Sequence, residues 1–77
     1  MRKNLLLDVS QRPPRESQSR LLDLFDRAMI GDSIKLVSDS RVAPICQVLF
    51  EEREGQFLCH MNREAPSEWV ARIIKTR

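Results

Sequence analysis

Two cysteines and one histidine are the residues of this 77-residue chain best suited to nucleophilic chemistry. Cys46 follows Pro44 by two residues, and a proline there suits the first turn of a helix, where unpaired N–H groups lower a thiol pKa. Cys46 is therefore the candidate reactive thiol, with a buried and inert side chain as the alternative. Cys59 stands on the expected inward side of a strand, which favours a structural role.

The single histidine, His60, leaves no set of ligands with zinc spacing, so neither a metal site nor a cofactor is expected. Cys46 and His60 are expected on opposite sides of a sheet, which argues against a cysteine–histidine dyad and places His60 at the surface. The chain also lacks a glycine-rich phosphate loop and a serine in a nucleophile elbow. These absences favour a protein without a catalytic site of its own.

The side chains best suited to hold an anion or an acidic partner are arginines in or beside two loops that lead into expected helices: Arg12, Arg15 and Arg41. Helix N-termini favour negative charge, and guanidinium groups bind phosphate, sulfate and carboxylate. The alternative is that these arginines are solvated or pair with nearby carboxylates, which contributes only about 0–1 kcal/mol per exposed pair.

The composition predicts one compact domain over residues 1–77, because 42% of the residues are hydrophobic and the chain is too short for two cores. The 13 basic and 11 acidic residues give a net charge of +2, which creates no strong field towards nucleic acid or a membrane. Asp8 interrupts the apolar run Leu5–Leu7, so neither a signal peptide nor a membrane span is expected. A cytoplasmic location with free cysteines follows as the expectation.

Hydrophobic periodicity divides the chain into four strands and two helices. Gly31 and Gly55 end the helices, because glycine adopts the left-handed backbone conformation without a side-chain clash. The expected strands are Leu5–Val9, Ser33–Ser38, Phe57–Asn62 and Trp69–Ile74, with a turn over Arg63–Glu68 between the last two. The expected helices run from Pro14 to the Gly31-Asp32 stop and from Pro44 to about Glu54.

This order predicts an α+β fold, a two-layer α/β sandwich with a four-stranded mixed sheet and both helices on one face. With helices as crossovers, the first three strands run parallel and the last runs antiparallel to them.

Strand alternation leaves apolar residues on the sheet face away from the helices. The expected inward residues are Leu5, Leu7, Val9, Ile34, Leu36, Phe57, Cys59, Met61, Trp69, Ala71 and Ile73. The expected outward residues are Leu6, Val37, Leu58, Val70 and Ile74. Such a patch predicts self-association or a docking partner, and the alternative is an ordinary surface interrupted by Lys35, His60 and Arg72.

The order and spacing of several short motifs resemble the bacterial family called domain of unknown function 2249, over almost the whole chain. The motifs are Leu7-Asp8-Val9, Arg12-Pro13-Pro14, Leu22 with Phe25-Asp26, Gly31-Asp32-Ser33, Ser38-Asp39, Pro44, Gly55-Gln56-Phe57, and Trp69-Val70 with Ile73. That family is related to the TusA/SirA sulfur-carrier proteins, so the resemblance implies the same two-layer fold.

In those carriers, a Cys-Pro pair at the start of the first helix supplies the cysteine that forms a persulfide. Here Pro13 stands before Pro14 at that place, so the resemblance implies that the usual sulfur-carrier site is missing. Members of the family also occur joined to hemerythrin-like domains, which implies an accessory role beside a redox or metal protein.

The leading expectation is a non-enzymatic accessory module that binds another protein through the open sheet face or the arginine-bearing loop edge. The alternative is a sulfur-carrier or sulfur-relay protein that uses Cys46, which requires this thiol to be accessible and acidic. RNA binding ranks last, because it uses exposed aromatics for stacking and at least three of the four aromatic residues suit a core: Phe25, Phe50, Phe57 and Trp69.

Overall fold

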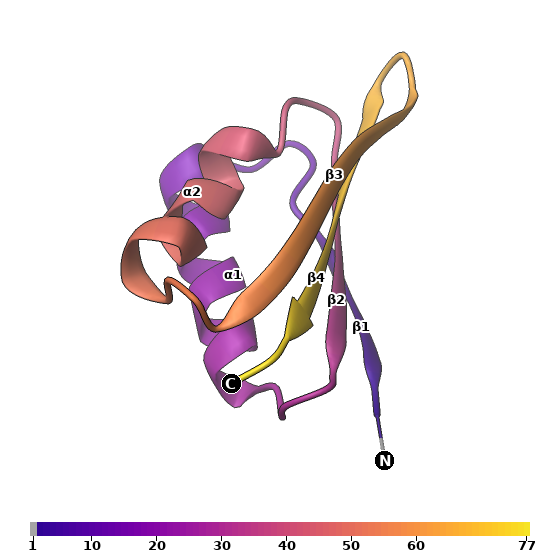
Figure 1. Cartoon of the computed structure of the whole chain (residues 1–77). Coiled ribbons are helices and arrows are strands. Elements are labelled where there is room, and N and C mark those ends of the chain that lie inside the picture. The colour runs from indigo at the N-terminus through magenta and orange to yellow at the C-terminus, as the bar shows by residue number, and fades with distance from the viewer. Residues whose placement is uncertain (1) are drawn as a thin grey trace.

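The computed structural model describes residues 2–77, in which two helices cover one face of a four-stranded sheet (Figure 1). The strands are β1 (Asn4–Asp8), β2 (Ser33–Ser38), β3 (Phe57–Ala65) and β4 (Glu68–Lys75), and the helices are α1 (Pro14–Arg27) and α2 (Ala43–Glu52). The strand order is β1-β2-β4-β3, with β1 parallel to β2 and β4 antiparallel to both of its neighbours. The predicted α+β sandwich is confirmed. Neither helix within residues 2–77 has the length and apolar character needed to cross a membrane.

The first helix starts where predicted and ends earlier. Pro14 opens α1, because a proline there gives up only an N–H group that the first turn leaves unpaired. The carboxylate of Asp32 accepts the N–H of Met29 at 2.9 Å, so the backbone turns away instead of adding another helical turn. Met29 therefore lies beyond the end of the helix, where it is 69% exposed.

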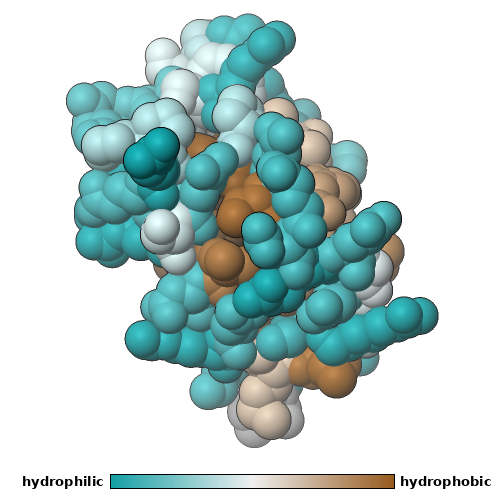
Figure 2. Space-filling model, turned by 90° about the vertical axis from the view of Figure 1, so that its left-hand side faces the viewer, coloured by the Kyte–Doolittle hydropathy of each residue, from teal (hydrophilic) through white to brown (hydrophobic). Residues whose placement is uncertain are grey.

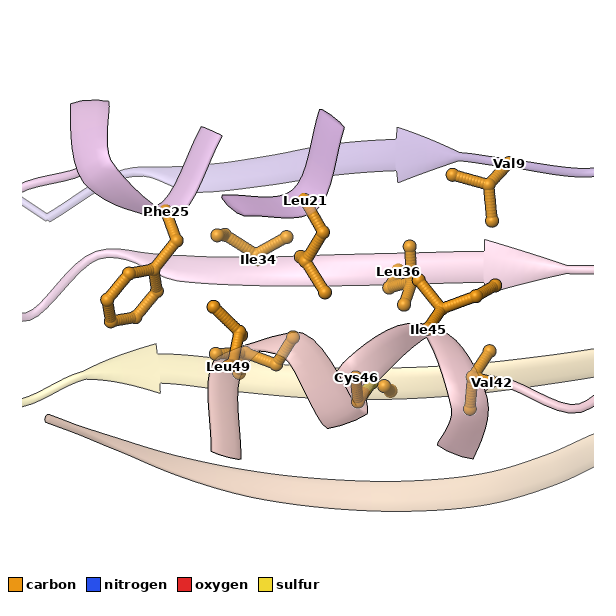
Figure 3. Packing of buried hydrophobic residues seen from close by; sticks show 11 residues of the cluster. Val9, Leu21, Phe25, Ile34, Leu36, Val42, Ile45, Cys46 and Leu49 are labelled. Atoms are coloured by element: carbon orange, nitrogen blue, oxygen red, sulfur yellow. The ribbon is translucent and has the colours of Figure 1, made fainter. Parts of the chain in front are cut away.

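The core lies between the helices and the sheet (Figure 3). Leu21 and Phe25 descend from α1 onto Ile34 and Leu36 of β2. The residues of α2 in the same cluster are Ile45, Cys46 and Leu49, with Val42 just before the helix. Arg53 holds the two helices together, since its Nε and Nη2 donate to the carboxylate of Asp26 at 2.9 and 2.8 Å.

The β3–β4 hairpin is longer than the sequence predicts. Residues expected in a turn over Arg63–Glu68 continue both strands, and only Pro66 and Ser67 lie between them. A bulge between Arg63 and Ala65 adjusts the register there. The hydrophobic alternation stops at Met61 because this part of the hairpin projects beyond the helix layer, where backbone pairing continues without a core to bury side chains (Figure 1).

The loop after α1 is fixed by the buried carboxylate of Asp32, which is 3% exposed. Its oxygens accept the N–H groups of Lys3 and Met29, both at 2.9 Å, and these bonds hold the pKa of Asp32 below its usual value of 3.8. Lys75 completes the junction, because its Nζ donates to the carbonyls of Phe25 and Ala28 at 3.0 and 2.8 Å. Asp32 and Lys75 together thus tie both ends of the chain to the end of α1.

Replacement Asp32→Asn is expected to make stability less dependent on pH. Because the pKa of Asp32 is lower in the folded protein than in the unfolded chain, its contribution is present above the unfolded value and is lost as pH falls through the folded value. Urea midpoints measured from pH 7 down to about pH 3 should therefore fall more steeply for the native protein than for the variant. Replacement Asp23→Asn is the control, since Asp23 is exposed and meets only Arg27. Parallel curves for all three proteins would refute this role.

Candidate partner-binding groove

A groove of about 740 Å³ lies between α2 and the β3–β4 hairpin. The residues that define it are Arg41, Pro44, Phe50, Met61, Arg63 and Trp69. The groove exists because the hairpin continues past the end of the helix layer, so the inner face of β3 has no helix above it there. Its volume lies in the range of about 300–1,000 Å³ usual for binding sites.

The groove exposes large apolar side chains that a folded protein usually covers. Phe50 is 50% exposed and Met61 is 42% exposed. Phe50 is nevertheless held firmly, because its ring packs edge-on against Phe57 at 5.0 Å, and Phe57 packs against Phe25 of the core at 5.9 Å. On the helix side of the molecule, apolar side chains reach the surface near the middle of the face, surrounded mainly by hydrophilic ones, and a smaller apolar group shows near the lower edge (Figure 2).

The charged side chains of the groove are arginines. The guanidinium of Arg63 lies 4.7 Å from the ring centroid of Trp69 and donates to the carbonyl of Pro66 at 2.7 Å, so it is held over the aromatic wall. Arg41 at the other side makes no ion pair with residues 2–77. Within the described part of the chain, no carboxylate lines this groove. The site is apolar inside and positive at its margin.

Two of the three arginines expected to bind an anion come together in the structure, and the third lies apart from them. Arg12 and Arg41 line a smaller pocket of about 300 Å³ at the starts of the two helices, together with Ser38 and Ser40. Arg15 is not part of that lining. Arg12 is engaged by Glu16 at 3.1 Å. Arg41 alone of the three therefore reaches both this pocket and the α2–hairpin groove.

The thiol of Cys46 is neither accessible nor acidic. Cys46 is 0% exposed on the inner side of α2, and its hydrogen bond to Cys59 together with burial raises its pKa far above the usual value. Proximity to the helix start does not compensate, because the side chain points into the core rather than along the helix axis (Figure 3). A sulfur carrier that uses Cys46 would need an accessible and acidic thiol at this position, and the structure provides neither property.

Cys59 is the more accessible of the two cysteines. It is half-buried on β3, and the hydrogen bond from Cys46 stabilises its thiolate and lowers its pKa below 9.0, against the opposing effect of burial. His60 follows Cys59 and stands level with Arg72 on the opposite face of the sheet, so it does not form a dyad with Cys46. Among residues 2–77, no three histidine, cysteine or acidic side chains gather to bind a metal ion.

The open sheet face carries its apolar residues in separate groups. Leu58 and Ile74 stand opposite each other and are 65% and 42% exposed, whereas Leu6 is distant on β1. A row of polar residues, Lys35 on β2, Arg72 on β4 and His60 on β3, separates the Leu58–Ile74 pair from the Val37–Val70 pair.

Val70, expected to be exposed on this face, is only 2% exposed. It stands opposite Val37, and the ion pair between Arg72 and Glu64 at 3.6 Å joins β4 to β3 beside it. Val70 therefore adds no exposed apolar surface to this face. The exposed apolar surface that a partner could meet there is reduced to Leu6 and the Leu58–Ile74 pair.

No family model matches this chain, and no curated protein or solved structure matches it either. The fold is consistent with that of the TusA-like sulfur carriers in element order and in its four-stranded mixed sheet.

The sequence contained a signal for the groove that hydrophobic alternation alone does not reveal. Pro44 and Gly55 limit the second helix to about ten residues, while the segments on either side of Pro66 are long enough to pair well beyond it. Met61 was expected to face inward, and it does lie on the side of the groove, but no helix covers it. Phe50 is the most exposed of the aromatic residues and lies at the core margin.

Cys59 is expected to react with iodoacetamide much faster than Cys46 in the folded protein, because only Cys59 is accessible and its pKa is lowered. Mass spectrometry after alkylation from about pH 6 to about pH 10 should show a lower midpoint for Cys59 in the folded protein than in the urea-unfolded chain, with Cys46 protected until urea is added. A Cys59→Ser variant should be almost unreactive when folded. Rapid modification of Cys46 in that variant would contradict the buried position.

Proposed function

We propose that this domain is a non-enzymatic accessory module that binds an extended segment of another protein in the α2–hairpin groove. The observation that carries the proposal is the pair Phe50 and Met61, which stay exposed in a groove bordered by Arg41 and Arg63. Apolar side chains held this way, with cations around them and no lining carboxylate within residues 2–77, favour a partner that is apolar and acidic.

The expected binding is weak to moderate for a single contact. Burying a fully exposed Phe or Met side chain contributes about 1.5–3 kcal/mol, and both side chains are about half exposed, so covering them contributes about that amount in total. Carboxylates of the partner near the two arginines add orientation and a faster association rate more than affinity. Such a site suits reversible attachment to a partner that carries the chemistry.

The accessory role agrees with the resemblance to the domain of unknown function 2249 family, whose members occur beside hemerythrin-like domains. Relationship to that family is part of the proposal and rests on motif order together with the fold. Self-association through Leu58 and Ile74 is a second surface for the same role, smaller than the sequence suggested because Val70 is buried. The buried thiol of Cys46 gives no support to sulfur transfer.

Selection from a display library of random twelve-residue peptides tests the proposal. We expect the selected peptides to be enriched in leucine, isoleucine, valine or phenylalanine together with aspartate or glutamate. Trp69 is the only tryptophan of the chain and lines the groove, so its fluorescence should change when a selected peptide binds. Replacements Met61→Glu and Arg41→Glu should each weaken binding about tenfold, which corresponds to about 1.4 kcal/mol.

Replacement Leu58→Glu is the matched control, because Leu58 lies on the same strand, is 65% exposed and faces the opposite side of the sheet. Circular dichroism and urea unfolding should show that all three variants fold. Selected peptides that bind the Met61→Glu and Arg41→Glu variants as tightly as the native domain would refute the groove as the binding site. Enrichment of no peptide at all would refute the proposed function.

A further inference from the structure

The outer edge of β3 is a free strand edge next to the groove. β3 is the last strand of the sheet and pairs with β4 alone, in the order β1-β2-β4-β3. Within residues 2–77, its backbone forms no hydrogen bond to the backbone of any element other than β4. Its nine residues extend over about 30 Å at about 3.3 Å per residue. Alternate N–H and C=O groups along this length point away from the sheet.

Before Arg63, the edge of β3 lacks the proline, the bulge and the charged side chains that protect strand edges. The segment Phe57–Ala65 contains no proline, and its bulge comes only at the far end, between Arg63 and Ala65. The other sheet edge differs, since β1 has five residues and is followed at once by a loop with Pro13 and Pro14. A long, regular edge with unpaired polar groups is a template for another strand.

Resting on the proposed function, we propose that the bound segment enters as a fifth strand that pairs with the free edge of β3. A strand added there lies about 4.8 Å from β3, and its alternate side chains then point to the inner side of the sheet. Met61 and Arg63 of β3 face that inner side, where Phe50 of α2 forms the opposite wall. One extended segment can thus pair its backbone with β3 and place its alternate side chains in the groove.

The charges of the groove favour an acidic partner over a second copy of this chain. In pairing between two β3 strands, the side chains brought to the groove side are those of β3 itself, namely Cys59, Met61 and Arg63. The second Arg63 then approaches a groove already bordered by Arg41 and Arg63, without a lining carboxylate in the described residues. A segment that alternates apolar side chains towards the groove and places acids near its margins avoids this repulsion.

Backbone N-methylation of a selected peptide separates strand addition from binding by side chains alone. Two versions of the peptide carry N-methyl groups on alternate residues, one on the odd positions and one on the even positions. In an added strand, only one of these sets directs its N–H groups at β3, so one version should lose about tenfold or more in affinity while the other stays close to the parent peptide. Fluorescence of Trp69 measures both.

Equal affinity of both versions and the parent, with continued sensitivity to Met61→Glu, would overturn strand addition and leave the groove function intact. Equal loss in both versions would also overturn it. Hydrogen exchange measured by NMR gives a second readout, because alternate amides of residues 57–65 should gain protection on binding while amides on the outer side of α1 do not. Absence of any slowed β3 amide, or a two-fold dimer formed through β3 in sedimentation, would overturn the proposal.

Discussion

One constraint shapes this molecule: a chain of 77 residues has enough apolar side chains to bury one face of a four-stranded sheet and no more. Both helices pack on that face. Leu21 and Phe25 of α1 and Leu49 of α2 meet β2 and β4 there, and these contacts fix where each helix lies. The opposite face has no helix over it and carries the polar side chains of Lys35, Arg72 and His60 between its apolar residues.

The groove is a consequence of unequal lengths within this layer. The ten residues of α2 rise about 15 Å, whereas the nine residues of β3 reach about 30 Å. The helix therefore cannot cover the hairpin from end to end. Phe50 stays at the margin with one side against Phe57, and Met61 lies beyond any helix contact that would bury it. An exposed aromatic supported by the core is stiffer than one on a loop, which lowers the entropy lost when a partner covers it.

Much of the fold followed from local patterns, because prolines and glycines mark the helix ends and strand alternation divides the sheet into two faces. The sequence could not reveal that Asp32 would end α1 early, since the Lys3 N–H that also binds it is 29 positions away. It could not reveal the burial of Cys46, because helix periodicity near a start allows both an inward and an outward thiol. The burial of Val70 likewise could not be predicted, because strand alternation assigns it to the face away from the helices.

Both chain ends lie at one end of the molecule, and the tip of the hairpin lies at the other (Figure 1). The hydrogen bonds of Asp32 and Lys75 hold the two ends there, near the end of α1. Any polypeptide or surface attached at either end therefore leaves the molecule away from the groove. Tethering would raise the effective concentration of the groove around a nearby acidic segment, with flexible linkers reaching about millimolar values. A contact too weak to persist between free molecules would then suffice for stable attachment.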